Sequence, residues 1–280
     1  MLLTLAAALA GCSAIKLGYN TLGDVAYWWL DSYIDFTEAQ RPLVRQDLAR
    51  LHAWHRAEEL PRFAELLHQM EEMAPGEVSP QQACAFVPEF RQRIAAVTQR
   101  AEPAIVALAV GLSAEQLAHI NHKYDKNNAS YTADWVKLPP AQLRQKRYRQ
   151  FLDRSEMIYG RLDEPQREAL RLDVERSTFD PRRILAERQR RQQDALRTLR
   201  QMSQPRTTLA EARQLWHASL ERALVPPDRA ARAYQDALIE EGCRHFSVLH
   251  NSTTAAQREA AVRRLRAYQR DLRDLAAQPQ

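Results

Sequence analysis

The stretch that decides the fold is LSAEQ, residues 112–116. It places Ser113 three residues before Gln116, the spacing of a capping box, in which each side chain bonds the other's backbone amide at a helix start. Five further stretches repeat this chemistry: FTEAQ (36–40), VSPQQ (78–82), LDEPQ (162–166), TTLAE (207–211) and TTAAQ (253–257). Each cap is worth about 1 kcal/mol. Helix starts are therefore specified locally along the chain.

Between these starts, apolar residues recur at helical spacing. Two such stripes are Leu60, Phe63, Leu67 and Met70, and Phe86, Phe90, Ile94 and Val97. Glycine is scarce at 7 of 280 residues, and no apolar and polar residues alternate long enough to indicate a strand. Because a one-sided helix is unstable alone, the stripes must pack together. We expect an all-α multi-helix bundle or irregular helical array of about eight to ten helices, with residues 24–277 as a single domain.

The N-terminal segment is apolar and free of charge from Met1 to Gly11. It is too short to span a bilayer, which takes about 20 residues, and it is typical of the end of a secretory signal. Residues 9–12, LAGC, resemble the lipobox of bacterial lipoproteins. That resemblance implies that Cys12 is acylated and becomes the first residue of the mature chain. The alternative is an apolar N-terminus with an ordinary buried cysteine.

These features predict residues 1–11 as a signal peptide remnant and residues 12–23 as a lipidated tether. The true start can lie upstream, because the remnant lacks the Lys or Arg of a signal peptide. By resemblance to lipoprotein sorting, Ser13 implies the periplasmic face of the outer membrane. Cys84 and Cys243 then remain, and an oxidising periplasm permits a disulfide between them. Two separate buried thiols are the alternative.

Two polar segments are candidate binding sites. The segment 121–135, NHKYDKNNASYTADW, interrupts the helical periodicity and is expected to be a loop. It could hold a polar or anionic ligand through Lys123, Tyr124, Lys126, Asn127 and Asn128, or it could be a capped corner between helices. Residues 187–194, ERQRRQQD, contain no apolar side chain. Their Arg188, Arg190 and Arg191 are expected on a solvated or bridging helix, with contact to phosphate groups or an acidic partner as the alternative.

Aromatic and histidine residues suggest further sites. The stretch AYWWLDSYIDF (26–36) is expected to be the first helix of the core, with the bilayer interface as the alternative. His52 with His55, and His119 with His122, lie one helical turn apart. However, no HExxH motif, clustered cysteines or acidic ligand loop accompanies them. We therefore predict no metal, no cofactor and no catalytic constellation.

Two family resemblances follow from longer matches. FTEAQ, LSAEQ and LDEPQ resemble the LTxxQ motif of the Spy and CpxP type of periplasmic helical chaperones, which implies client binding, although capping alone produces the same letters. A family of proteobacterial lipoproteins of unknown function, all-helical by prediction, is similar over nearly the whole mature chain. The matching stretches are LAGCSAIKLGYN, AYWWLDSYIDFTEAQ, KYDKNNASY, YGRLDEPQ, ERQRRQQ and RRLRAYQRDLRDLA.

Together these observations predict a periplasmic lipoprotein anchored in the outer membrane, with a protein partner in the envelope and no nucleic-acid partner. The expected role is a non-enzymatic interaction or scaffold protein. The first alternative is a Spy-like or CpxP-like chaperone. The second is a metal-binding or small-molecule-binding protein or an unrecognised hydrolase.

Overall fold

The computed structural model describes residues 15–278, and it confirms the all-α prediction. Residues 15–20 are helical, and from Leu22 to Ala277 the chain forms eleven continuous helices, ten of them seven residues or longer, with no strand in this part. In this count, α-helical and π-helical segments that follow without a break, over residues 40–73 and 114–136, are each one helix. The elements are α2 (Leu22–Ile34), α3 (Gln40–Trp54), η1 (His55–Glu59), α4 (Leu60–Met73), α5 (Pro80–Cys84), α6 (Phe86–Val110), α7 (Ala114–Tyr131), η2 (Thr132–Val136), α8 (Pro140–Tyr159), α9 (Glu164–Arg176), α10 (Pro181–Met202), α11 (Leu209–Leu224), α12 (Arg229–Asn251) and α13 (Ala255–Ala277).

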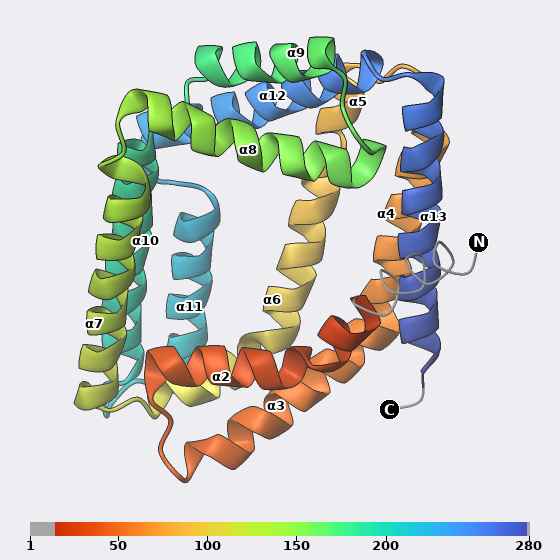
Figure 1. Ribbon diagram of the computed structural model, residues 1–280. Coiled ribbons are helices and arrows are strands. Elements are labelled where there is room, and N and C mark those ends of the chain that lie inside the picture. The colour runs from red at the N-terminus through yellow and green to blue at the C-terminus, as the bar shows by residue number, and fades with distance from the viewer. Residues whose placement is uncertain (1–14, 279–280) are drawn as a thin grey trace.

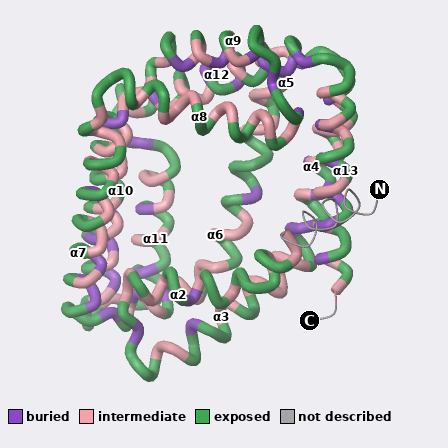
Figure 2. The backbone as a smooth tube through the Cα atoms, viewed as in Figure 1, coloured by how far each residue is buried: buried purple, intermediate pink, exposed green. Residues whose placement is uncertain are grey.

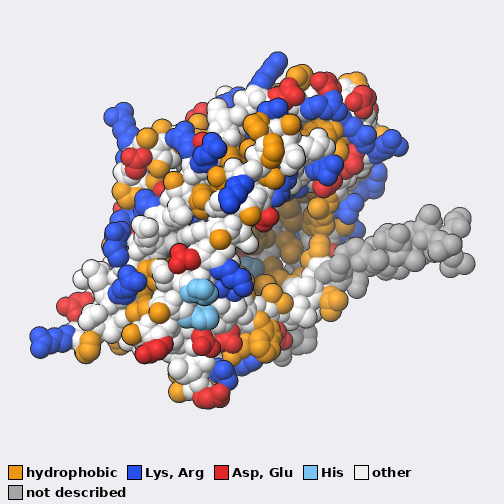
Figure 3. Space-filling view, turned by 60° about the vertical axis from the view of Figure 1, so that its left-hand side comes forward, with side chains coloured by type: hydrophobic (Ala, Val, Ile, Leu, Met, Phe, Trp, Pro, Cys, Tyr) orange, Lys and Arg blue, Asp and Glu red, His pale blue; other side chains and the backbone are white. Residues whose placement is uncertain are grey.

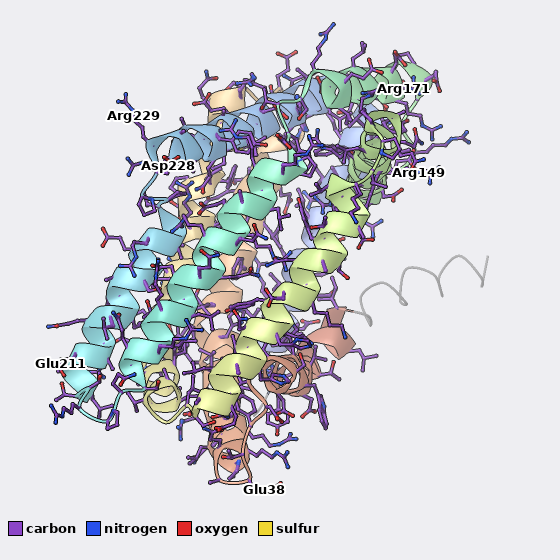
Figure 4. The ribbon with its side chains drawn as sticks, turned by 90° about the vertical axis from the view of Figure 1, so that its left-hand side faces the viewer. Glu38, Arg149, Arg171, Glu211, Asp228 and Arg229 are labelled. Carbon is purple, nitrogen blue, oxygen red and sulfur yellow. A yellow bond between two sulfur atoms is a disulfide. The ribbon has the colours of Figure 1, made fainter. Side chains whose placement is uncertain are left out.

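The helices form an open frame (Figure 1). In that view α7, α10 and α11 make the left side, α8, α9 and α12 the top, α4 and α13 the right side, and α2 and α3 the bottom, while α6 crosses between the lower and upper edges. Figure 4, seen from the side, shows α7, α10 and α11 running next to one another. The chain exposes 17028 Å², against about 12,000 Å² for a compact monomer of 32.3 kDa.

Many of the buried apolar side chains gather in four small clusters. One joins α8, α9, α12 and α13, a second joins α6, α10 and α11, a third joins α7 and α10, and a fourth joins α2 and α3. Figure 2 shows the buried residues as short stretches distributed around the frame. Each helix therefore packs against a few neighbours and leaves much of its surface exposed.

All six predicted capping boxes form. Five have both bonds at the start of α5, α7, α9, α11 and α13. In the sixth, the Gln40 amide donates to Thr37 Oγ1 at 3.3 Å and the Thr37 amide donates to Gln40 Oε1 at 3.1 Å. The residue before the box is a buried hydrophobic residue in four cases, at Phe36, Val78, Leu112 and Leu162. These hydrophobic residues fix the direction in which the chain enters the helix.

The boxes also join helices to each other in two pairs. Gln166 Nε2 donates to Gln257 Oε1 at 2.8 Å, and Gln257 Nε2 donates back to Gln166 Oε1 at 2.9 Å, which links the starts of α9 and α13. At the other pair, Gln116 Nε2 donates to Gln40 Oε1 at 2.7 Å, which links the starts of α7 and α3. In each pair, the glutamine that completes the capping box of its own helix therefore also bonds to the glutamine at the start of a second helix.

Both π-helical segments lie close to prolines. Pro61 lies two residues after the end of η1, and Pro139 and Pro140 lie three and four residues after the end of η2. Because proline has no amide hydrogen, it cannot complete the regular helical ladder. The backbone instead bonds five residues back, as where the Leu60 amide donates to the His55 carbonyl.

A disulfide joins α5 to α12. Cys84 and Cys243, 159 positions apart, lie with their Cα atoms 5.4 Å from one another and their sulfurs bonded. Nearby, Ser247 Oγ donates to the Val78 carbonyl at 2.6 Å, and the Val78 amide donates to Asn251 Oδ1 at 2.9 Å. The segment between α4 and α6 is thus held against the C-terminal helices by covalent and polar contacts.

Candidate binding surfaces of the helical frame

α6 has an apolar stripe that remains partly exposed. Its residues Phe86, Phe90, Ile94 and Val97 recur at helical spacing and so share one face. Phe90 is 40% exposed and Ile94 is 57% exposed. The only buried residue in the first four turns of α6 is Arg93, which lies one helical turn from Phe90 and Val97 and so on the same side of the helix. The sequence predicted this stripe and its burial against other helices, but in the structure the neighbouring helices cover it only in part.

A buried ion pair holds this part of α6. Arg93 Nη1 lies 3.4 Å from both carboxylate oxygens of Glu59, which is the last residue of η1. Glu59 is 1% exposed. The Phe63 and Phe90 rings pack beside the pair with centroids 6.4 Å apart. Glu59 and Arg93 were not among the predicted site residues, because in sequence a glutamate and an arginine on helices have the pattern of ordinary surface charges.

A second apolar surface lies on α2. Leu22, Val25 and Trp29 are spaced to share one helix face, and Trp28 lies beside them. All four are exposed, Trp28 by 63% and Trp29 by 57%. The expectation that the aromatic stretch fills the core is therefore correct for Tyr27 and Phe36, which are buried, and wrong for the two tryptophans.

The frame encloses a hollow. Figure 3 shows this hollow, and many of the side chains inside it are hydrophobic. Charged side chains gather instead on the outer parts of this view. In Figure 4 the labelled charges, such as Arg149, Arg171 and Glu211, point away from the frame. The arrangement can accept an apolar segment more readily than a charged small molecule.

The first histidine pair surrounds a tyrosine. The Tyr19 hydroxyl lies 2.9 Å from His55 Nδ1, and its ring centroid lies 4.7 Å from that of His52. Burial raises the pKa of Tyr19 to about 12 and lowers the pKa of both histidines below the ordinary value. The Arg56 guanidinium donates hydrogen bonds to Asn20 Oδ1 and to the Leu275 carbonyl. This cluster fastens the start of the described chain to its end.

The second histidine pair does not form a cluster. His119 Nε2 lies 3.3 Å from the Ser32 carbonyl, and His122 is exposed. Across residues 15–278, no three His, Cys, Asp or Glu side chains are placed to share a metal ion.

The prediction of a loop over residues 121–135 is wrong. These residues continue α7 to Tyr131 and then form η2. Asn, Asp and Ser favour turns, but contacts with neighbouring helices outweigh this local preference. Asn128 Nδ2 donates to Gln192 Oε1 on α10 at 2.7 Å, and Asn127 Nδ2 donates to the Tyr33 hydroxyl on α2 at 2.5 Å.

The five residues expected to share a ligand in this segment do not converge. Lys126 is exposed, whereas Asn128 is buried and Tyr124 is half-buried. Burial raises the pKa of Tyr124. Lys123 lies over the Tyr33 ring, with its ammonium 5.3 Å from the centroid. Most of these side chains join α7 to α2 and α10, so the segment has a structural role.

The arginine segment of α10 is bridging. Arg190 pairs with Glu187 at 2.8 Å and donates to the Arg222 carbonyl on α11 at 2.8 Å. The Arg188 guanidinium lies 5.7 Å from the Tyr131 ring centroid, and Arg191 lies 3.4 Å from the Glu187 carboxylate. The three arginines therefore do not form one open basic patch, because each already contacts a carboxylate, a carbonyl or an aromatic ring.

Comparison with known proteins identifies a family. A family model described as "Family of unknown function (DUF6279)" matches residues 32–221, which extend from the end of α2 into α11. No curated protein and no solved structure matches the chain.

The predicted lipid site at Cys12 lies outside the described residues. Within residues 15–278, no single helix is long and apolar enough to cross a membrane. One pair, Pro80–Val110 with Ala114–Val136, passes by length and composition together and is bent by 118°.

Proposed function

The chain belongs to this family of unknown function, and we propose that it is a non-enzymatic scaffold of the cell envelope that holds an apolar segment of a partner protein against α6. The described residues are all-helical and pack as a frame, which suits support and binding.

The observation that carries this proposal is the exposed part of the α6 stripe. Phe90 and Ile94 are one helical turn apart, and both are exposed beside the partly buried Phe63. Apolar side chains one turn apart form a continuous apolar surface on α6, against which the apolar face of an amphipathic partner segment can pack. An exposed apolar surface of this kind marks an interaction site in many soluble proteins. The buried Glu59–Arg93 pair holds α6 against η1 on this side of the helix, and Phe90 and Ile94 remain exposed beside it.

The proposed envelope location has separate support. Disulfides persist in oxidising compartments such as the periplasm, and the structure joins Cys84 to Cys243. The LAGC letters at residues 9–12 add the lipobox resemblance, by which Cys12 would be acylated.

The test places a photocrosslinking amino acid at position 94 in the full chain expressed in a Gram-negative host. We expect a discrete adduct with an envelope protein. Position 248 on α12 is the matched control, because Val248 is 52% exposed but lies on another helix. Equal adducts from positions 94 and 248 would contradict the proposal.

A matched pair of variants completes the test. Ile94→Asp should abolish copurification of the captured partner, and Val248→Asp should leave it unchanged. Both side chains are exposed, so each variant should unfold within about 0.5 kcal/mol of the parent. Retention of the partner by Ile94→Asp at normal stability would also overturn the proposal.

The second candidate is a chaperone for unfolded clients, favoured by the same exposed stripe. The glutamines of FTEAQ, LSAEQ and LDEPQ already have structural roles in helix caps and helix pairs. Shared letters with Spy and CpxP are therefore explained by capping. A chaperone would suppress aggregation of an unfolded substrate at a near-stoichiometric ratio, and position 94 would crosslink to many proteins.

A further inference from the structure

We infer that the exposed face of α2 lies against a lipid bilayer surface, beside the N-terminal anchor. The inference rests on the acylation of Cys12 proposed above, but it concerns a different surface from the partner site on α6. It assigns the four exposed apolar residues Leu22, Val25, Trp28 and Trp29 to the interface between headgroups and acyl chains.

The first argument is the chemistry of the face. Tryptophan suits the bilayer interface, because its ring is largely apolar and its N–H can bond to water or headgroups. An amphipathic helix lies in this zone with its apolar face inserted about 5–10 Å. Leu22, Val25 and Trp29 share one face of α2, whereas Tyr27 on the other side packs into the cluster with Phe36.

The second argument is the position of the charges. At 100° per residue, Asp24 and Asp31 lie on the opposite side of α2 from Leu22 and Trp29. Asp31 Oδ1 accepts the Phe36 amide at 2.9 Å, and Asp24 lies 3.8 Å from Arg45 on α3. Asp31 is therefore engaged with the protein. Asp24 lies one helical turn from Trp28, at the edge of the apolar face, where its charge is next to that of Arg45.

The third argument is the chain that leads into α2. Residues 1–14 contain no charged side chain, and the first charge is Lys16. Lys16 is fastened to α13 by its 2.6 Å contact with Asp274. Residues 15–20 and α2 both lie at the front of the frame in Figure 1. From Cys12 to Ile15 the chain can extend only about 10 Å, so a lipid on Cys12 holds this part of the molecule close to the bilayer.

The test uses the full acylated chain in phospholipid vesicles that carry bromine on their acyl chains. Bromine quenches nearby tryptophans, and two of the five tryptophans lie on this face. We expect a loss of up to about two fifths of the emission. The double variant Trp28→Phe, Trp29→Phe keeps the face apolar and should lose this quenching.

A charge variant tests the face directly. Val25→Asp should reduce the quenching at least twofold. Leu209→Asp is the matched control, because Leu209 is equally exposed at the start of α11, and it should change nothing. Unchanged quenching in Val25→Asp would overturn the inference.

Vesicle flotation separates the anchor from the face. If the wild-type chain floats with the vesicles but its tryptophans are not quenched, the anchor holds and the inference about α2 is wrong. If it does not float, the acylation proposal fails and the inference fails with it. A protein adduct from a crosslinker at position 25, without quenching, would assign the face to a protein partner and also overturn the inference.

Discussion

The paired glutamines predict an unusually large effect for a single polar substitution, Gln166→Ala. Gln166 is 2% exposed. Its Oε1 accepts from the Asp163 amide at 3.0 Å and from Gln257 Nε2 at 2.9 Å, and its Nε2 donates to the Ser252 carbonyl at 3.0 Å and to Gln257 Oε1 at 2.8 Å. Removing it deletes four hydrogen bonds and leaves polar partners without their bonds.

The expected cost follows from these contacts. A neutral hydrogen bond contributes about 1 kcal/mol net, and an unsatisfied buried partner costs about 1–3 kcal/mol. Gln166→Ala should therefore lower the free energy of unfolding by about 3–4 kcal/mol. Gln82→Ala is the matched control, because Gln82 is exposed and completes a capping box without a facing glutamine. Its loss should be about 1 kcal/mol.

Urea unfolding measures the difference. With a slope of about 3 kcal/mol per molar urea, the midpoint should fall by roughly 1 M for Gln166→Ala and by roughly 0.3 M for Gln82→Ala. Circular dichroism and tryptophan fluorescence should give the same midpoint.

A double-mutant cycle isolates the pair. Gln166→Ala and Gln257→Ala should couple by about 1–2 kcal/mol, because each removes the same two reciprocal bonds. Additive effects, or equal losses for the Gln166 and Gln82 variants, would refute the reasoning that the facing amide stabilises the corner.

Three further predictions concern the frame. Replacing Cys84 and Cys243 by alanine should lower the free energy of unfolding by about 5 kcal/mol, from loop-closure entropy over 159 positions; a thermal shift no larger than that of an exposed Ala substitution would contradict this. Arg93→Ala should cost about 3–5 kcal/mol, because it leaves the buried Glu59 carboxylate with only the exposed Arg62, at 4.0 Å; in urea unfolding, Glu59→Gln combined with Arg93→Met should recover much of the loss, and no recovery would refute the charge explanation. Burial lowers the pKa of His250, so the unfolded chain takes up the proton first as pH falls below about 6.5; the urea midpoint should fall from pH 7.5 to pH 5.0, less steeply in His250→Gln, and equal slopes would exclude His250 as a cause.

Local patterns predicted the helices because their signals need no distant residue. A capping box such as Ser113 with Gln116 involves one turn of chain, and all six predicted boxes form. The apolar stripe of α6 was also readable at its helical spacing. Neither the capping boxes nor the apolar stripe indicates which helices meet. A helical bundle and the observed open frame therefore agree equally well with both patterns.

The segment 121–135 shows where local patterns fail. Its Asn and Asp residues favour a loop, but Asn127 and Asn128 are bonded to side chains 94 and 64 positions away, on α2 and α10. Arg190 is likewise bonded across 32 positions to α11. These partners are not adjacent in the chain, so no local propensity could indicate that the segment is helical.

The sequence by itself determined where the six helices with capping boxes begin, which helix faces are apolar, and that the chain is all-α, because capping bonds and helical periodicity act over a few residues. Only the tertiary structure decided which starts pair through their glutamines, that Glu59 and Arg93 meet in a buried pair, and that the faces of α2 and α6 stay exposed. The physical reason is that a side chain's burial depends on residues distant in the chain. An amphipathic stripe specifies that a helix can bury one face, and the packing of the other helices decides whether it does.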